Sequence, residues 1–477
     1  MPLFFTSVIL LVLGYFIYGS LIDRIFGVDP TRKTPVETLE DGVDYVKLPP
    51  WKIFLIQLLN IAGLGPIYGP ILGALYGPVA LIWIVFGCIF GGAVHDYFSG
   101  MLSVRYDGQS IPDVVGHHLG NSIKQFMRGF SVILLVLVGV VFFLGPAALL
   151  ESLTGIDKRI LIGIIIAYYF LATILPVDKI IGHIYPLFGA VLVFMAIGTI
   201  SMLIIKGYEF YPIKTFQNIN PQDLPMWPLM FITIACGAVS GFHATQSPMM
   251  ARCLPNERYG RSVFYGSMIA EGIIALIWAT LAISFFPTPE ILNAVLGEGG
   301  PGLVVDKVSK ELLGQVGGIM AIIGVVVLPV TSGDTAFRSA RLIIADVFKI
   351  PQKNTFKRLV IAVPLFIAGY LISLSDFGLI WRYFGWANQA LAVFVLWTAA
   401  AYLADKHKFH WVATVPAVFM TVVAVTFIAN STIGFNLPMP VATVIGIGAA
   451  VLAVVMFFRK THQIASADQL VKAGKNL

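Results

Sequence analysis

Residues 60–70 read Asn-Ile-Ala-Gly-Leu-Gly-Pro-Ile-Tyr-Gly-Pro, and they lie inside a longer apolar stretch. Pro66 has no N–H group, so the carbonyl of Ala62 loses its helical partner. Gly63 and Gly65 lower the cost of unwinding the chain at the same place. A helix that breaks within a membrane exposes N–H groups that attract a carboxylate and carbonyls that can hold a cation. We therefore expect a substrate site lined by Asn60, Ala62, Gly63 and Gly65.

A second apolar stretch, residues 227–249, is interrupted in the same way. It contains Gly-Ala-Val-Ser-Gly-Phe-His at 237–243, where a helix can break near Ser240 and Gly241. We expect Ser240, Gly241 and His243 to contribute to the substrate site. For His243, a buried structural histidine is the alternative interpretation.

The composition of the whole chain is that of a membrane protein. Of its 477 residues, 58% are hydrophobic and only 12% are charged, and the mean hydropathy is +0.87. Apolar stretches of about 20 residues, long enough to cross a bilayer, recur from end to end. Lipid tolerates little but helices in such a chain, so we expect an all-α polytopic protein. About thirteen transmembrane helices are predicted, at 3–22, 52–77, 79–103, 129–150, 159–176, 184–205, 227–249, 263–286, 312–333, 357–375, 386–403, 411–430 and 439–458.

The spacing of the two interrupted stretches predicts an inverted repeat. Residues 51–226 and 227–403 each hold five apolar segments, and each block begins with a glycine-interrupted helix. An odd number of helices turns the second block upside down relative to the first, the pattern typical of transporters of the leucine-transporter type. Residues 1–50 would add a first helix and a cytoplasmic loop, and residues 404–477 two further helices and a cytoplasmic tail.

Charge and cysteine usage fit this organisation. Lys and Arg concentrate in the loops after odd-numbered segments, which predicts an outside N-terminus and an inside C-terminus. The net charge of +6 therefore reflects cytoplasmic loops, and we expect no nucleic-acid partner. The three cysteines, Cys88, Cys236 and Cys253, form no CxxC pattern, so neither a disulfide framework nor a zinc site is expected.

Ionisable residues inside apolar segments are candidates for proton coupling. Glu271 lies in the middle of an apolar segment, where a carboxylate is costly and usually functional. We expect it to carry or gate a proton, with a structural carboxylate as the alternative. His95 and Asp96 are expected near the cytoplasmic side, either as a proton relay or gate or as an interfacial pair.

Further polar residues enter the membrane in the later segments. Asn388 and Gln389 are expected to line the substrate path. Thr331 and Ser332 would coordinate sodium with the carbonyl of Ala62 if sodium drives transport. Asp334 and Arg338 have the i,i+4 spacing of a helical salt bridge.

These motifs together resemble the carbon starvation protein A family, here in its short form, without the C-terminal region of longer relatives. The resemblance spans roughly residues 50–400 and rests on several long motifs, at 60–70, 91–96, 237–243, around Glu271, 331–341 and 381–389. It implies a carrier of the amino-acid/polyamine/organocation superfamily in the bacterial inner membrane. Family members are described as carriers of peptides, and some as proton-driven pyruvate importers used in nutrient limitation.

Residues and resemblance together predict a secondary transporter that imports peptides or pyruvate, used under carbon starvation and driven by protons. A sodium-coupled symporter of the same fold and a membrane nutrient sensor are the alternatives. A channel is disfavoured because no filter-type repeat is present, and an intramembrane enzyme because GxSxG, HExxH and metal clusters are absent. No cofactor is expected; the expected partners are the substrate, the coupling ion and the lipid bilayer.

Overall fold

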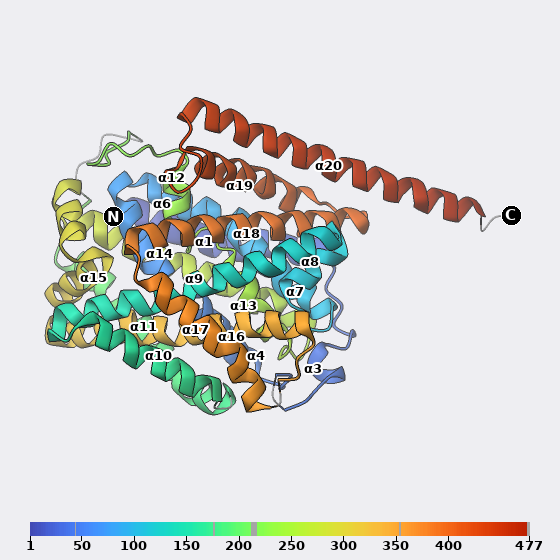
Figure 1. Cartoon of the computed structure of the whole chain (residues 1–477). Coiled ribbons are helices and arrows are strands. Elements are labelled where there is room, and N and C mark those ends of the chain that lie inside the picture. The colour runs from blue at the N-terminus through green and yellow to red at the C-terminus, as the bar shows by residue number, and fades with distance from the viewer. Residues whose placement is uncertain (43, 175–176, 211–216, 353, 475–477) are drawn as a thin grey trace.

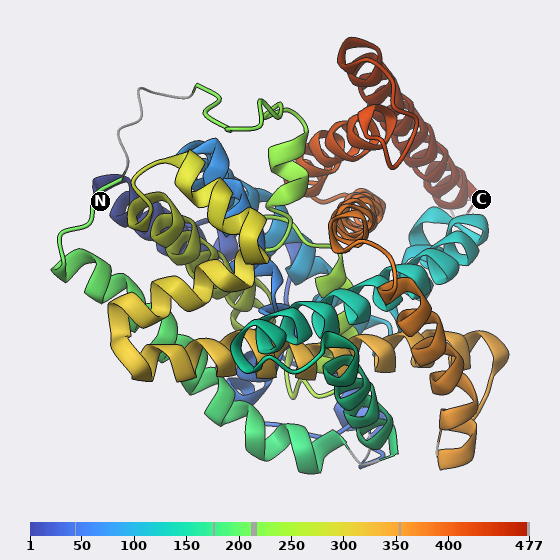
Figure 2. The same ribbon diagram turned by 60° about the vertical axis from the view of Figure 1, so that its left-hand side comes forward.

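The chain is all-helical, as the sequence predicts. The computed structural model describes residues 1–42, 44–174, 177–210, 217–352 and 354–474, and within them there are helices and loops but no strands (Figure 1). Long helices such as α9 (Asn121–Thr154) and α18 (Phe377–Asp405) run along the molecule side by side. α19 (Trp411–Asn430) and α20 (Met439–Gly474) pack together at one edge, where they are red in Figure 2.

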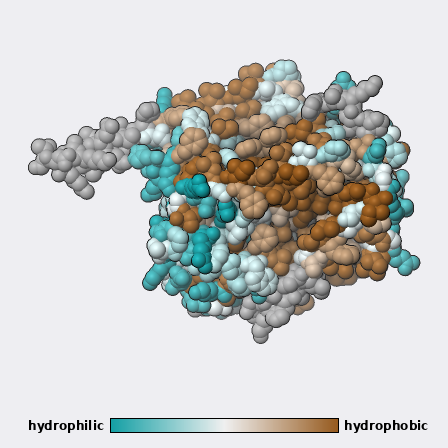
Figure 3. Space-filling view, turned by 180° about the vertical axis from the view of Figure 1, so that it is seen from behind, coloured by the Kyte–Doolittle hydropathy of each residue, from teal (hydrophilic) through white to brown (hydrophobic). Residues whose placement is uncertain are grey.

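The outer surface is that of a membrane protein. Figure 3 shows an apolar band across the middle of one face, with hydrophilic residues gathered mainly at its two ends. Many large apolar side chains are exposed on the outer helices, among them Ile164, Phe194, Ile367 and Val444. In water such a surface would drive association, whereas lipid solvates it. The protein is therefore multi-pass.

Eight helices are long and apolar enough to cross a membrane, and two bent helix pairs raise this number to ten within the described residues. In the part of the chain that the structure describes, each of the thirteen predicted segments contains helix, but thirteen crossings, their orientation and the inverted repeat stay predictions. The eight spans are Pro2–Phe26, Val79–Arg105, Asn121–Glu151, Glu257–Phe285, Thr355–Ser373, Phe377–Asp405, Trp411–Asn430 and Met439–Thr461.

The first predicted break is present. Helix α4 (Pro50–Ile61) ends at Ala62, whose ψ of 53° leaves the helical region, and α5 (Gly65–Gly73) starts three residues later. The two halves meet at an angle of 49°. The local sequence explains the break, because Pro66 stands in the first turn of α5 and cannot donate the hydrogen bond that would continue α4.

The second predicted break is present and wider. Helix α12 (Leu229–Thr233) stops at Ile234, and α13 (Phe242–Ala251) begins after Gly241. Gly237 lies between them with φ of +86°, a conformation that favours glycine. The residues between the two halves are fully or almost fully buried, so this irregular backbone is enclosed by protein, as a membrane interior requires.

The sequence prediction fails around the ninth segment. The loop expected after residue 286 contains most of α15 (Pro289–Ile322), which has non-helical residues at Gly299, Gly300 and Gly314. The helix predicted to end at 333 continues through α16 (Leu328–Phe348). Charged residues hide both features from a hydropathy reading, because they lower the apolar content of segments that are nevertheless helical.

Other helices enclose the two breaks. A π-helical turn at Gly87–Gly92 connects α6 and α7 within the span Val79–Arg105. A similar turn at Arg261–Tyr265 precedes α14. The remaining helices are α1 (Pro2–Phe16), α2 (Tyr18–Phe26), α3 (Pro35–Thr38), α6 (Val79–Phe86), α7 (Ala93–Arg105), α8 (Ile111–Leu119), α10 (Lys158–Ile174), α11 (Val177–Ile205), α14 (Gly266–Phe285) and α17 (Thr355–Ser373).

Candidate substrate and coupling site

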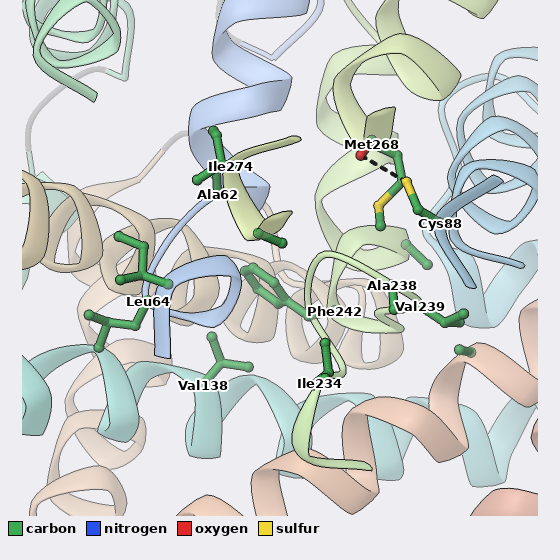
Figure 4. Packing of buried hydrophobic residues seen from close by; sticks show 14 of the residues in the cluster. Ala62, Leu64, Cys88, Val138, Ile234, Ala238, Val239, Phe242, Met268 and Ile274 are labelled. Atoms are coloured by element: carbon green, nitrogen blue, oxygen red, sulfur yellow. Dashed lines mark hydrogen bonds between the residues drawn. The ribbon is translucent and has the colours of Figure 1, made fainter. Parts of the chain in front are cut away.

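The two breaks face each other in the centre of the molecule. A Cβ atom on Gly65 would lie 2.2 Å from Sγ of Cys236, and one on Gly69 would lie 3.0 Å from the carbonyl of Thr233. Figure 4 shows Ala62 and Leu64 from the first break in the same packed region as Ile234, Ala238 and Phe242 from the second. The glycines of the first break therefore serve close helix contact as well as unwinding.

Asn388 holds the second break in place. Its Oδ1 accepts a hydrogen bond of 2.6 Å from the N–H of Phe242, the first residue of α13, and its Nδ2 lies 3.1 Å from Oγ of Ser240. The N–H of Gly241 bonds to the backbone carbonyl of Asn388 at 3.2 Å. Asn388, predicted to line the substrate path, thus stabilises the start of α13.

Four fully buried ionisable residues form a continuous cluster beside this break, called here the buried ionisable cluster: His95, Asp96, His243 and Glu271. Nδ1 of His95 lies 2.7 Å from Oδ1 of Asp96, and Nδ1 of His243 lies 2.8 Å from Oδ2 of the same carboxylate. Nε2 of His243 lies 3.3 Å from Oε2 of Glu271. The buried ionisable cluster joins three separate helices, α7, α13 and α14.

Proton positions in the buried ionisable cluster follow from the chemistry of its side chains. A carboxylate only accepts hydrogen bonds, so Nδ1 of both histidines donates to Asp96. A lone pair on Nε2 of His243 would repel an ionised Glu271, so one proton must lie on one of these two side chains. Either residue can carry that proton.

His95 and Asp96 are expected near the cytoplasmic side, and their position relative to the membrane stays a prediction. Their helix continues to Arg105, and both side chains are completely buried against the second break.

Further polar contacts extend from the buried ionisable cluster along α13. The hydroxyl of Ser247 donates to the carbonyl of His243 at 3.0 Å, and it lies 3.2 Å from both Oγ of Ser99 and Nε2 of Gln57. Gln57 lies on α4 just before the first break. These contacts link the two breaks by polar groups as well as by packing.

The predicted sodium ligands are partly brought together. The hydroxyl of Ser332 on α16 donates to the carbonyl of Leu59 at 3.2 Å, near the end of α4. Ser332 is buried, Thr331 beside it is half-buried, and Ala62 is the residue that caps α4. The neighbouring salt bridge between Asp334 and Arg338 is confirmed at 3.2 Å.

The other predicted residues lie around the breaks in supporting positions. Asn60 is buried on the last turn of α4. A Cβ on Gly63 would lie 2.7 Å from the ring of Phe142, and one on Gly241 would lie 2.2 Å from the carbonyl of Asn388. Nε2 of Gln389 donates to the carbonyl of Phe231 at 3.1 Å, so this residue supports α12.

Two cavities lie away from the breaks, toward opposite ends of the bundle. One of about 750 Å³ is lined by Lys124, Arg128 and Arg252, among others. The other, of about 440 Å³, is lined by Tyr68, Trp381 and further residues at the start of α18. Between them the residues of the breaks are fully or almost fully buried, so the centre is closed to both ends in this conformation.

Cys236 is the central residue that the sequence did not single out. Its Sγ lies 3.4 Å from Oγ of Ser240 and 3.8 Å from Nδ2 of Asn388. A lone cysteine in an apolar segment carries no signal of its own. Only its place one residue before the left-handed Gly237 marks it as part of the unwound segment.

Comparison with known proteins adds a family to this geometry. The family model described as carbon starvation protein CstA matches residues 1–152, 130–294 and 294–429. An uncharacterised membrane protein of Haemophilus influenzae is 47% identical over 62% of this chain and 94% of its own length. The peptide transporter CstA of Bacillus subtilis is 27% identical over 87% of this chain and 88% of its own length.

A further relative and a solved structure are also similar to this chain. The pyruvate/proton symporter BtsT of Escherichia coli is 27% identical over 57% of this chain and 47% of its own length. A solved structure of a manganese transporter of Eremococcus coleocola, 12% identical, covers 89% of this chain and 99% of that one with a TM-score of 0.56, which shows a shared fold. The family match covers most of the chain, and the helical architecture agrees with it. The chain is a multi-pass membrane transporter and belongs to the carbon starvation protein CstA family.

Proposed function

We propose that this protein is a proton-coupled importer of a small anionic or zwitterionic nutrient, pyruvate or a short peptide, in the bacterial inner membrane. The observation that carries the proposal is the 3.3 Å contact between Nε2 of His243 and Oε2 of Glu271, two buried groups of which one must carry a proton. Because this proton lies against the second break, its loss would change the contact that holds α13 to α14. Movement of a proton would in this way be tied to movement of a broken helix.

The relatives give the proposal its substrate classes. One named relative is a peptide transporter and another is a pyruvate/proton symporter. Both kinds of substrate carry a carboxylate, and the N-terminus of α5, where the helix dipole favours an anion, lies at the first break. We place the substrate carboxylate there, with Asn60, Ala62, Gly63 and Gly65 around it and Ser240 and Gly241 opposite.

The proposed transport cycle uses the two halves as inverted repeats. Residues 51–226 and 227–403 would alternate around the facing breaks, with residues 1–50 and 404–477 outside this core. Support comes from the place of the breaks, one near the start of each half, and from the cavities at both ends of a closed centre.

Uptake in proteoliposomes tests the proposal. Labelled pyruvate and a labelled dipeptide are offered in parallel to wild-type protein under an inward proton gradient, without sodium. We expect one of them to accumulate and a protonophore to abolish the accumulation. If folded protein accumulates neither substrate, with or without sodium, this assignment of substrates is wrong.

Sodium coupling is the second candidate, and Ser332 is the observation that favours it. Its hydroxyl already reaches a backbone carbonyl of α4, and a cation bound by Ser332, Thr331 and the carbonyl of Ala62 would hold α16 to the first break. Uptake that requires sodium and is lost in Ser332→Ala but not in Ser373→Ala would support it. Ser373 is an exposed serine at the end of α17 and is a suitable control.

A further inference from the structure

Cys236, His243 and Glu271 place three different metal-ligating atoms around one point. The sulfur, the imidazole nitrogen and a carboxylate oxygen all lie within 4.8 Å of one another, and all three residues are buried. They come from the unwound segment, from α13 and from α14. This grouping is not predictable from sequence, because the three residues share no ligand spacing.

Two of these residues have polar atoms without hydrogen bonds. Among the residues that the structure describes, neither carboxylate oxygen of Glu271 has a hydrogen-bond partner, and neither does Nε2 of His243. Such fully buried groups are rare, and each has a cost unless a proton or an ion satisfies it. One carboxylate oxygen of Glu271 and one ring nitrogen of His243 lie within 4.8 Å of Sγ of Cys236.

The imidazole of His243 is oriented as in many metal sites. Its Nδ1 donates to Asp96 at 2.8 Å, which fixes the ring and leaves Nε2 to face Glu271. A histidine that binds a metal through one nitrogen commonly donates its other N–H to a carboxylate. Asp96 therefore supplies the outer contact that a metal-binding histidine requires.

The distances and charges suit a divalent transition ion. Zinc bonds of about 2.0–2.3 Å in a tetrahedral site separate the ligand atoms by about 3.3–3.8 Å. The His243 and Glu271 atoms already have this separation, and the sulfur needs to approach by about 1 Å or less. A thiolate, a carboxylate and a neutral imidazole balance a 2+ charge, which lowers the cost of burying these ligands.

We propose that Cys236, His243 and Glu271 form a binding site for a divalent transition-metal ion of the zinc type, with Asp96 as the residue that orients His243. Sulfur and nitrogen ligands favour zinc or cobalt over magnesium or calcium, which prefer oxygen ligands. The ion takes the place of the proton between His243 and Glu271 and ties the unwound segment to α13 and α14. The inference goes beyond the proposed function, and metal binding is measured without transport.

Cobalt is the probe, because a cobalt–thiolate bond has a charge-transfer absorption. Protein purified in detergent without a histidine tag is titrated with Co²⁺, and its zinc content after growth with added zinc is measured by mass spectrometry. We expect one ion per chain, a thiolate band, and no competition from excess Mg²⁺. Absence of both the band and the zinc from folded wild-type protein overturns the proposal.

Substitutions locate the site within the chain. Cys236→Ser should abolish the thiolate band, whereas Cys88→Ser and Cys253→Ser, which change the other two buried cysteines, should retain it. Asp96→Asn should weaken binding about 10–100-fold, the effect typical of losing an outer contact. A band that survives Cys236→Ser and disappears in either control would assign the metal elsewhere and contradict the proposal.

Discussion

Nε2 of His243 lies 3.3 Å from Oε2 of Glu271, and this contact joins α13 to α14 beside the second break. Both side chains are completely buried. A proton on either side chain would be screened from water in this conformation. The proposed proton coupling therefore makes Glu271 the first residue to change.

Glu271→Gln should uncouple transport from the proton gradient. A carboxamide cannot release a proton, so concentrative uptake should fall on the order of 100-fold, as when a proton-transfer group is lost. Exchange of labelled for unlabelled substrate across the membrane needs no net proton movement and should persist. Both rates are measured in the same proteoliposomes.

Glu290→Gln is the matched control, because Glu290 is exposed at the start of α15. It should accumulate substrate as the wild type does. Concentrative uptake by Glu271→Gln at the wild-type rate would exclude Glu271 from the coupling step.

Gly65→Ala should force the two breaks apart. The added Cβ would lie 2.2 Å from Sγ of Cys236, and overpacking of this kind costs about 1–3 kcal/mol. Cβ of Cys236 would also lie only 2.4 Å from the added atom, so truncating the opposing side chain fully in Gly65→Ala/Cys236→Gly should restore part of the loss. Thermal unfolding in detergent of the wild type, both single variants and the double variant measures this coupling.

Gly129→Ala serves as the control, since a Cβ there would meet no atom within 4 Å. Its stability should stay the same or rise by up to about 1 kcal/mol, because alanine favours helix. A Gly65→Ala variant as stable as wild type would show that the breaks are not in tight contact.

Both breaks were predictable because their causes are local. Pro66 removes a helical hydrogen bond, and Gly237 adopts a positive φ, whatever the rest of the chain does. The apolar content likewise predicted an all-helical membrane protein. The extent of α15 and α16 was not predictable from hydropathy, because charged residues lie along helices that pack inside the protein.

The partners within the site could not be predicted from sequence. Asp96 and His243 are 147 positions apart, and Ser240 and Asn388 are 148 apart, so only the fold brings them together. Glu271 was singled out by its burial in an apolar segment, but its neighbour His243 was not assigned to it. Cys236 carried no signal, since a single cysteine among apolar residues is ordinary.

Asn388→Ala should loosen the second break without changing its charge. The change leaves the N–H of Phe242 and the hydroxyl of Ser240 without their partner, which costs about 1–3 kcal/mol for buried groups. Hydrogen exchange of peptides that cover residues 234–243 should become faster than in wild type. Mass spectrometry of the protein in detergent measures it.

Asn430→Ala removes a partly buried asparagine that donates to the carbonyl of Leu437 at the end of α19. It should leave exchange at 234–243 unchanged. Equal protection of this segment in Asn388→Ala and wild type would show that Asn388 does not hold the break.

Asp96→Asn should be the most destabilising of these single changes. The carboxylate of Asp96 accepts hydrogen bonds from two histidines, whereas a carboxamide accepts through one oxygen and presents an NH₂ group to the other ring. One histidine must then rotate or change its tautomer in a fully buried place. Removing one partner of a buried ionic pair costs about 3–5 kcal/mol, so the unfolding temperature in detergent should fall clearly. The ¹⁵N shifts of the imidazoles should report the altered tautomer.

Glu298→Gln breaks an exposed pair with Lys307 and should cost no more than about 1 kcal/mol. If Asp96→Asn and Glu298→Gln both unfold at the wild-type temperature, the Asp96 carboxylate does not organise His95 and His243. A proton between His243 and Glu271 must then be held by other groups.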